Sequence, residues 1–87
     1  MAFANKIKLG SKTVGWNVFF SHAEAEAVAL NQLSLPALLA GVTGPRVAPL
    51  LVPIPRQSWK ITCQAGGHDG VKAVVMFYPP SAILIPR

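Results

Sequence analysis

The residues best suited to chemistry gather in a glycine-rich segment, residues 66–70, where His68 precedes Asp69. A histidine beside a carboxylate can act as a base or ligate a metal, and glycine backbone amides can hold a phosphate. The other candidate metal ligands in the chain are His22, Glu24, Glu26 and Cys63. They are scattered along the sequence, and the glycines lack the lysine and following helix of a phosphate loop. We interpret residues 66–70 as a hairpin turn and expect no metal and no cofactor.

A second polar group, Ser21 with His22 and Glu24, superficially resembles part of a catalytic triad. The geometry of a triad is built in space, and neighbours at a helix start do not reproduce it. A serine followed three residues later by glutamate is typical of a capping box at the start of a helix. Only three acidic residues are present, and two belong to this segment, so we do not expect paired-carboxylate chemistry. The sequence predicts a protein that is not an enzyme.

The composition points to contact with another macromolecule. The chain has 87 residues, of which 52% are hydrophobic and 13% charged, whereas a typical soluble domain has about 25% charged residues. A core of this size cannot hide all of that apolar surface. Cys63 is the single cysteine, so an internal disulfide and a multi-cysteine zinc site are excluded. The net charge of +5 favours an acidic partner or, equally, serves solubility.

Local patterns predict an α+β fold: a small antiparallel sheet from two β-hairpins packed with one short helix, plus an extended Pro-rich arm. Alternating apolar residues on both sides of Gly10 and Ser11 predict the first hairpin, with a type II′ turn. The helix is expected over residues 23–33, followed by a short helical turn over 36–40. Alternation in residues 59–65 and 71–78 predicts the second hairpin, and residues 81–85 a last edge strand.

Residues 1–87 are expected to form a single small domain in three parts. These are a hairpin and helix (1–43), the extended arm (44–57), and a hairpin with a C-terminal tail (58–87). Four prolines between residues 45 and 55 are expected to exclude both a helix and a central strand from the arm. Two protein-contact surfaces are predicted. The arm contributes Arg46, Val47, Leu50, Leu51, Val52, Ile54 and Arg56, and the tail contributes Ile83, Leu84 and Ile85. Packing of the arm on its own sheet is the alternative.

A basic surface is the second candidate for contact. If both hairpins joined one sheet, several lysines and one aromatic residue would share its polar side, as in a platform for single-stranded nucleic acid. The residues of this surface are Lys6, Lys8, Lys60, Lys72 and Tyr78. The alternative is that exposed lysines keep a small sheet soluble and guard its edges.

The sequence therefore favours a structural or assembly protein that acts by protein–protein contact, such as an accessory or cement-like subunit of a larger particle, for example a viral one. Expected partners are a second copy of the chain or neighbouring subunits. A small basic nucleic-acid-binding protein is the first alternative, and an inhibitor that docks on a host protein is the second. The longest uncharged run, residues 27–45, is too polar for a membrane span. No signal peptide is visible, so the cytoplasm or a virion is the expected location.

Overall fold

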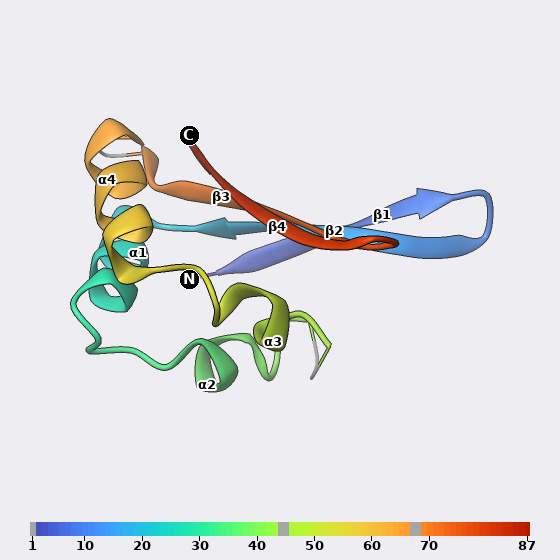
Figure 1. The fold of residues 1–87 in the computed structure, drawn as a ribbon, viewed down its shortest axis with the longest axis horizontal. Coiled ribbons are helices and arrows are strands. Elements are labelled where there is room, and N and C mark those ends of the chain that lie inside the picture. The colour runs from blue at the N-terminus through green and yellow to red at the C-terminus, as the bar shows by residue number, and fades with distance from the viewer. Residues whose placement is uncertain (1, 44–45, 67–68) are drawn as a thin grey trace.

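The computed structural model describes residues 2–43, 46–66 and 69–87. Four strands form one antiparallel sheet in the order β1-β2-β3-β4. The strands are β1 (Phe3–Leu9), β2 (Lys12–Phe20), β3 (Val71–Phe77) and β4 (Pro80–Pro86). All helices lie in the segment between β2 and β3, which are nevertheless neighbours in the sheet. The α+β class is therefore confirmed, with the helices to the left of and below the sheet in Figure 1.

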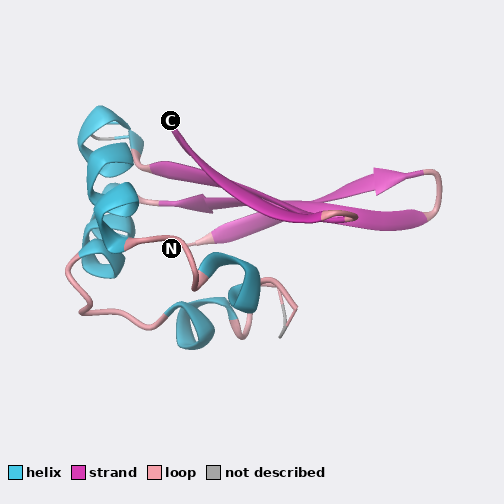
Figure 2. Cartoon of the chain, in the orientation of Figure 1, coloured by secondary structure: helices cyan, strands magenta, loops and turns pink. Residues whose placement is uncertain are grey.

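The first hairpin, predicted from the alternating apolar residues, is confirmed. β1 pairs with β2 around Gly10, whose φ of +65° suits the first turn position of a type II′ turn. A register shift between Ile7 and Lys8 adds one residue to β2, and such bulges increase the local twist. The tip of this hairpin projects away from the helices, to the right in Figures 1 and 2.

The capping box at Ser21 is confirmed and starts α1 (His22–Ala29). The Ser21 hydroxyl accepts a hydrogen bond from the Glu24 N–H at 3.2 Å, and the Glu24 carboxylate accepts one from the Ser21 N–H at 3.0 Å. The helix ends four residues earlier than predicted, just before Asn31 takes a left-handed φ of 60°. The short helical turn that follows is α2 (Leu35–Leu39).

The predicted strand over residues 59–65 is wrong. These residues belong to α4 (Arg56–Gly66), whose buried residues Trp59, Cys63 and Gly66 follow the spacing of a helix face. The second hairpin is therefore formed by β3 and β4, and the predicted edge strand supplies its second member. The turn predicted at residues 66–70 does not join two strands, because α4 precedes it; residues 67 and 68 lie outside the described part of the chain.

The predicted extended arm is also wrong, because residues 48–51 form the short helix α3 (Ala48–Leu51). Val47 and Leu51 are completely buried in the core of the same chain. Leu50 and Ile54 pack partly against that core, whereas Val52 is 55% exposed. Arg46 and Arg56 are exposed as well. The alternative in which this segment packs on its own domain is therefore the observed one.

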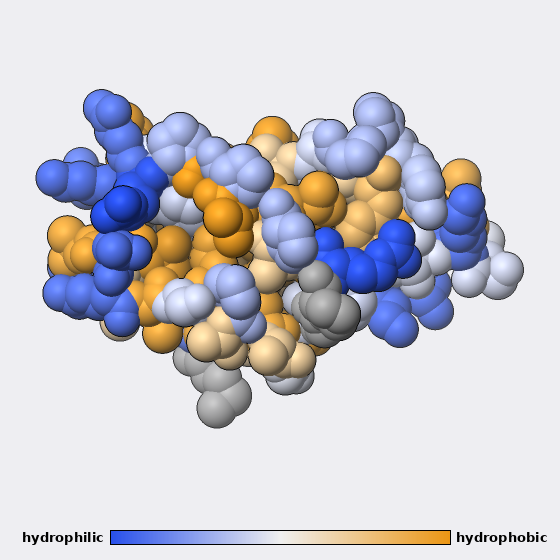
Figure 3. All heavy atoms as spheres, turned by 60° about the horizontal axis from the view of Figure 1, so that its bottom comes forward, coloured by the Kyte–Doolittle hydropathy of each residue, from blue (hydrophilic) through white to orange (hydrophobic). Residues whose placement is uncertain are grey.

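The core lies between the helices and one face of the sheet. On that covered face Val18 and Phe20 of β2 meet Ala73 and Val71 of β3, and all four are 0% exposed. Phe20 packs edge-on against Trp59 of α4, with ring centroids 5.2 Å apart and planes at 83°. The helical layer also exposes apolar side chains on the side of α2 and α3, as the orange surface in Figure 3 shows.

Candidate functional site: the open face of the sheet

The second face of the sheet, which we call the open face, carries the side chains that the helices do not bury. Strand pairing places them in rows, because residues opposite each other point to the same side. The helix-proximal row is Phe3, Phe19, Lys72 and Ile85. The next row is Asn5, Asn17, Val74 and Ile83, and the third is Ile7, Gly15, Met76 and Ser81. Eight of these twelve residues are apolar when Gly15 is counted, so the face is largely hydrophobic.

The open face divides along the strands into two halves of different chemistry. The aliphatic half, on β3 and β4, consists of Val74, Met76, Ile83 and Ile85. Ile83 is 57% and Ile85 38% exposed, and both lie on the edge strand β4. The aromatic half, on β1 and β2, consists of Phe3, Asn5, Asn17 and Phe19 and is flanked by Lys72 and Arg87. Each half therefore suits a different kind of contact.

The aromatic half is organised around two stacked rings. The centroids of Phe3 and Phe19 are 4.8 Å apart with planes inclined by 16°. The Lys72 ammonium lies 5.8 Å from the Phe19 centroid. The Arg87 guanidinium lies 5.1 Å from the Phe19 centroid and 5.9 Å from that of Phe3. These distances are within the range of cation–π attraction, so the two positive charges are held at the rings.

The positive charges of the molecule have few acidic neighbours. The three acidic residues lie on α1 and just before β3, so none is on a strand. In the described part of the chain no Lys or Arg forms an ion pair with a carboxylate, and the ion pair found there joins His22 to Glu26. Five of the eight Lys and Arg residues contact aromatic rings instead: Lys6, Lys12, Arg46, Lys72 and Arg87. These cations remain available to an anionic partner.

The structure does not gather the lysine surface predicted from the sequence. Lys72 lies on the open face, but Lys6 pairs with Trp16 on the opposite face and lies 5.7 Å from that ring. Lys60 is on α4. Tyr78 follows β3, where Lys12 lies 4.5 Å from its ring centroid.

Lys8 and Leu84 also lie apart from the other residues of the contact surfaces predicted for them. Lys8 pairs with Thr13 beyond the bulge, toward the tip of the first hairpin. In the predicted tail, Ile83 and Ile85 lie on the open face, whereas Leu84 pairs with Ala73 on the covered face and packs against the core. Alternation along β4 therefore leaves two of the three tail residues available for contact.

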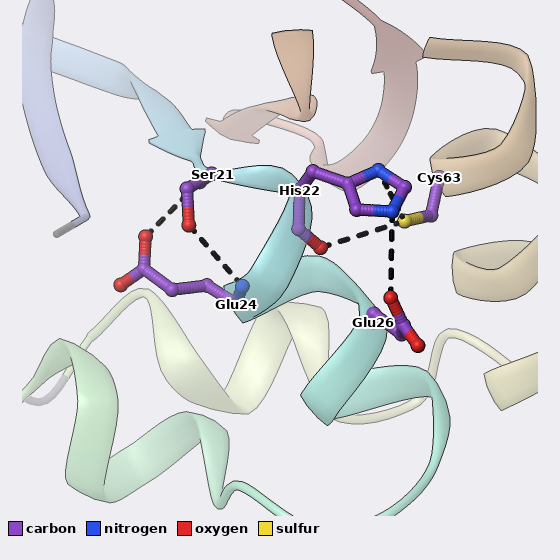
Figure 4. A network of polar contacts seen from close by, with 5 residues as sticks. All are labelled: Ser21, His22, Glu24, Glu26 and Cys63. Atoms are coloured by element: carbon purple, nitrogen blue, oxygen red, sulfur yellow. Dashed lines mark hydrogen bonds and ion pairs between the residues drawn. The ribbon is translucent and has the colours of Figure 1, made fainter. Parts of the chain in front are cut away.

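A polar cluster that the sequence did not reveal joins α1 to α4 (Figure 4). The Cys63 sulfur lies 3.5 Å from His22 Nδ1 and 3.6 Å from the His22 carbonyl oxygen. On the other side of the ring, His22 Nε2 lies 3.4 Å from a Glu26 carboxylate oxygen. A cavity of about 220 Å³ adjoins the cluster and is also lined by Lys60 and Gln64. Helical spacing could have indicated the pairing of His22 with Glu26, but Cys63 was placed on a strand.

The cluster has the order of a nucleophile, a base and a carboxylate, but its environment does not activate the thiol. Burial raises the pKa of Cys63, and the negative charge of Glu26 raises it further, so the thiol stays protonated near neutral pH. Backbone N–H groups around Cys63 are engaged within α4 and are not free to stabilise an oxyanion. The contacts of the cluster hold α1 against α4.

The same cluster does not form a metal site. Cys63 and Glu26 approach different nitrogens of His22, so one ion cannot be bound by all three side chains. Within the described ranges, no group of three or more His, Cys, Asp or Glu residues is arranged to hold a metal ion.

The chain matches no protein family, no curated protein and no solved structure. None of the helices in the described residues has the length and hydropathy needed to cross a membrane.

Proposed function

We propose that this protein is non-catalytic and acts by protein–protein contact, with the aliphatic half of the open face as the contact surface and a second copy of the chain as its occupant. The observation that carries this proposal is the exposure of Ile83 and Ile85 on an edge strand, beside Val74 and Met76. Neighbouring apolar side chains on one sheet face gain free energy when a partner removes them from water.

A self-complementary contact suits this surface for two reasons. Among the described residues, no strand neighbours the outer side of the edge strand β4, and such edges readily pair with another chain. An isologous contact between two copies also requires only one patch, because the same residues meet each other. Pro80 and Pro86 are the first and last residues of β4, and they confine any strand pairing with another chain to the residues between them.

The size of the face predicts a weak association. The whole open face, with four strands about 4.8 Å apart and seven residues at about 3.3 Å each, has an area of about 440 Å², and the aliphatic half provides about half of it. A standard interface buries about 800 Å² per partner. Each copy also carries a net charge of +5, which opposes association at low salt. We therefore expect a dimer that forms at high protein concentration and becomes more stable as salt screens the repulsion.

The experiment is sedimentation velocity over a wide range of protein concentrations, with Ile83→Lys as the test variant. Ile61→Lys is the matched control, because Ile61 is 58% exposed and lies on α4, away from the open face. The wild type and Ile61→Lys should dimerise alike, and Ile83→Lys should remain monomeric. A wild type that is monomeric at every concentration, or two variants with equal effects, would refute self-association through this surface.

A further inference from the structure

The aromatic half of the open face has a composition that differs from a protein-contact patch. Phe3 is 52% exposed on the edge strand β1, so part of its ring is accessible from outside the sheet. Asn5 and Asn17 lie directly opposite each other in the adjacent row and carry amides that both donate and accept hydrogen bonds. Stacking rings beside amide groups and two cations form a mixed surface that an aliphatic partner would not match.

We propose that this half binds single-stranded nucleic acid, with a base stacked on Phe3 and backbone phosphates contacted by Lys72 and Arg87. Lys72 lies within 6 Å of the Phe19 ring and Arg87 within 6 Å of both rings, so a base at the rings places its phosphate near these cations. The amides of Asn5 and Asn17 are placed to hydrogen-bond to base edges.

Charge complementarity supports a polyanion as the occupant. No acidic residue lies on any of the four strands, and within the described chain Lys72 and Arg87 have no carboxylate partner. An acidic protein would satisfy the charges but would not use the stacked rings. An open sheet face also suits the splayed bases of a single strand better than the stacked bases of a duplex.

The first test is fluorescence anisotropy with labelled 15-nucleotide oligo(dT) and oligo(U), at 50 and 200 mM salt. Phe3→Leu keeps an apolar side chain but removes the ring, and Phe3→Ala removes both. Loss of one stacked base predicts affinity weaker by about 5- to 150-fold for either variant. Tyr78→Ala is the matched control, because Tyr78 is 60% exposed and lies in the turn after β3; it should bind like the wild type.

The second test separates a specific site from general attraction to a basic protein. Lys72→Gln should weaken binding and reduce its salt dependence, whereas Lys60→Gln, on α4, should change both much less. Circular dichroism and thermal unfolding of each variant verify that the fold is retained.

Three results would overturn the proposal: no binding at 50 mM salt, equal losses in Lys72→Gln and Lys60→Gln, or equal affinity for a duplex of the same length. The effect of salt distinguishes this site from self-association, because salt should weaken nucleic-acid binding but strengthen the dimer.

Discussion

Phe19 and Phe20 are adjacent in β2 but belong to opposite faces of the sheet. Phe20 is completely buried and packs against Trp59, whereas Phe19 is half-buried and stacks on Phe3 among the cations of the open face. The whole of β3 shows the same division, because its residues are alternately buried and partly exposed although nearly all are apolar. The helical layer is large enough to cover one face only, and the second face accounts for part of the apolar surplus in the composition.

The largest difference in stability between the two faces is expected for substitutions at Phe20 and Phe19. Phe20→Ala removes a completely buried ring and its contact with Trp59, so we expect a loss of about 3–5 kcal/mol in the free energy of unfolding. Phe19→Ala loses only a partly exposed cross-strand pair and should cost about 1 kcal/mol. Urea unfolding followed by circular dichroism measures both. Equal losses would show that the two faces contribute equally to stability.

A second contrast concerns two glycines with positive φ. Gly70 leads into β3 with a φ of +89°, and an added Cβ would overlap the carbonyl oxygen of Phe20. Gly10, at the hairpin tip, has a φ of +65° and open space around the same position. Gly10→Ala should therefore cost only the conformational strain, about 1–2 kcal/mol, and Gly70→Ala should cost more. Thermal unfolding of the two variants side by side tests this order.

The capping box should have a smaller and pH-dependent effect on the helical layer. Ser21→Ala should cost about 1 kcal/mol. Burial acts to raise the pKa of the Glu24 carboxyl, but favourable interactions, of which the hydrogen bonds with Ser21 are the largest, together outweigh burial and lower the pKa. A lowered pKa in the folded state stabilises the fold above the ordinary carboxyl pKa, and this stabilisation is lost as the pH falls.

The wild type should therefore exceed Glu24→Gln in stability at neutral pH, and the difference should shrink at about pH 3. Chemical unfolding of both proteins over this range measures it. A difference that is constant with pH would contradict the role of the charged carboxylate.

The smallest effect on stability is expected on the aliphatic half. Ile83→Ala at low protein concentration should change the free energy of unfolding by about 0.5 kcal/mol or less, because Ile83 is 57% exposed. The same variant should reduce association at high concentration. The free energy of unfolding is measured at both concentrations. A large loss at low concentration would place Ile83 in the core rather than in an interface.

Elements encoded by local signals could be predicted from the sequence. The first hairpin follows from alternation and the Gly10 turn, and α1 follows from the capping box. The error at residues 59–65 has a physical reason: a window of seven residues fits both a strand period and a helix period. Burial of Trp59 against Phe20, far away in sequence, favours the helix. Propensity is overridden by such tertiary contacts.

The arm illustrates a second limit. The four prolines lead to the prediction that no helix forms here, but Pro49 lies within the first turn of α3, where no intrahelical N–H bond is lost. The open face could be predicted in part from the sequence, because β3 is apolar on both faces. Which face stays open depends on where the helices pack. The arrangement of Lys72 and Arg87 around Phe19 depends on strand order, and neither feature is encoded locally.

The neighbouring positions of β2 and β3 also determine how the chain folds. Each hairpin joins residues close in sequence, and such hairpins form on a scale of about 1–10 µs. Pairing Phe20 with Val71 must instead close a loop that contains every helix, at a larger entropic cost. Contacts of this long range slow folding. We therefore expect the hairpins to form early and the pairing of β2 with β3 to limit the folding rate.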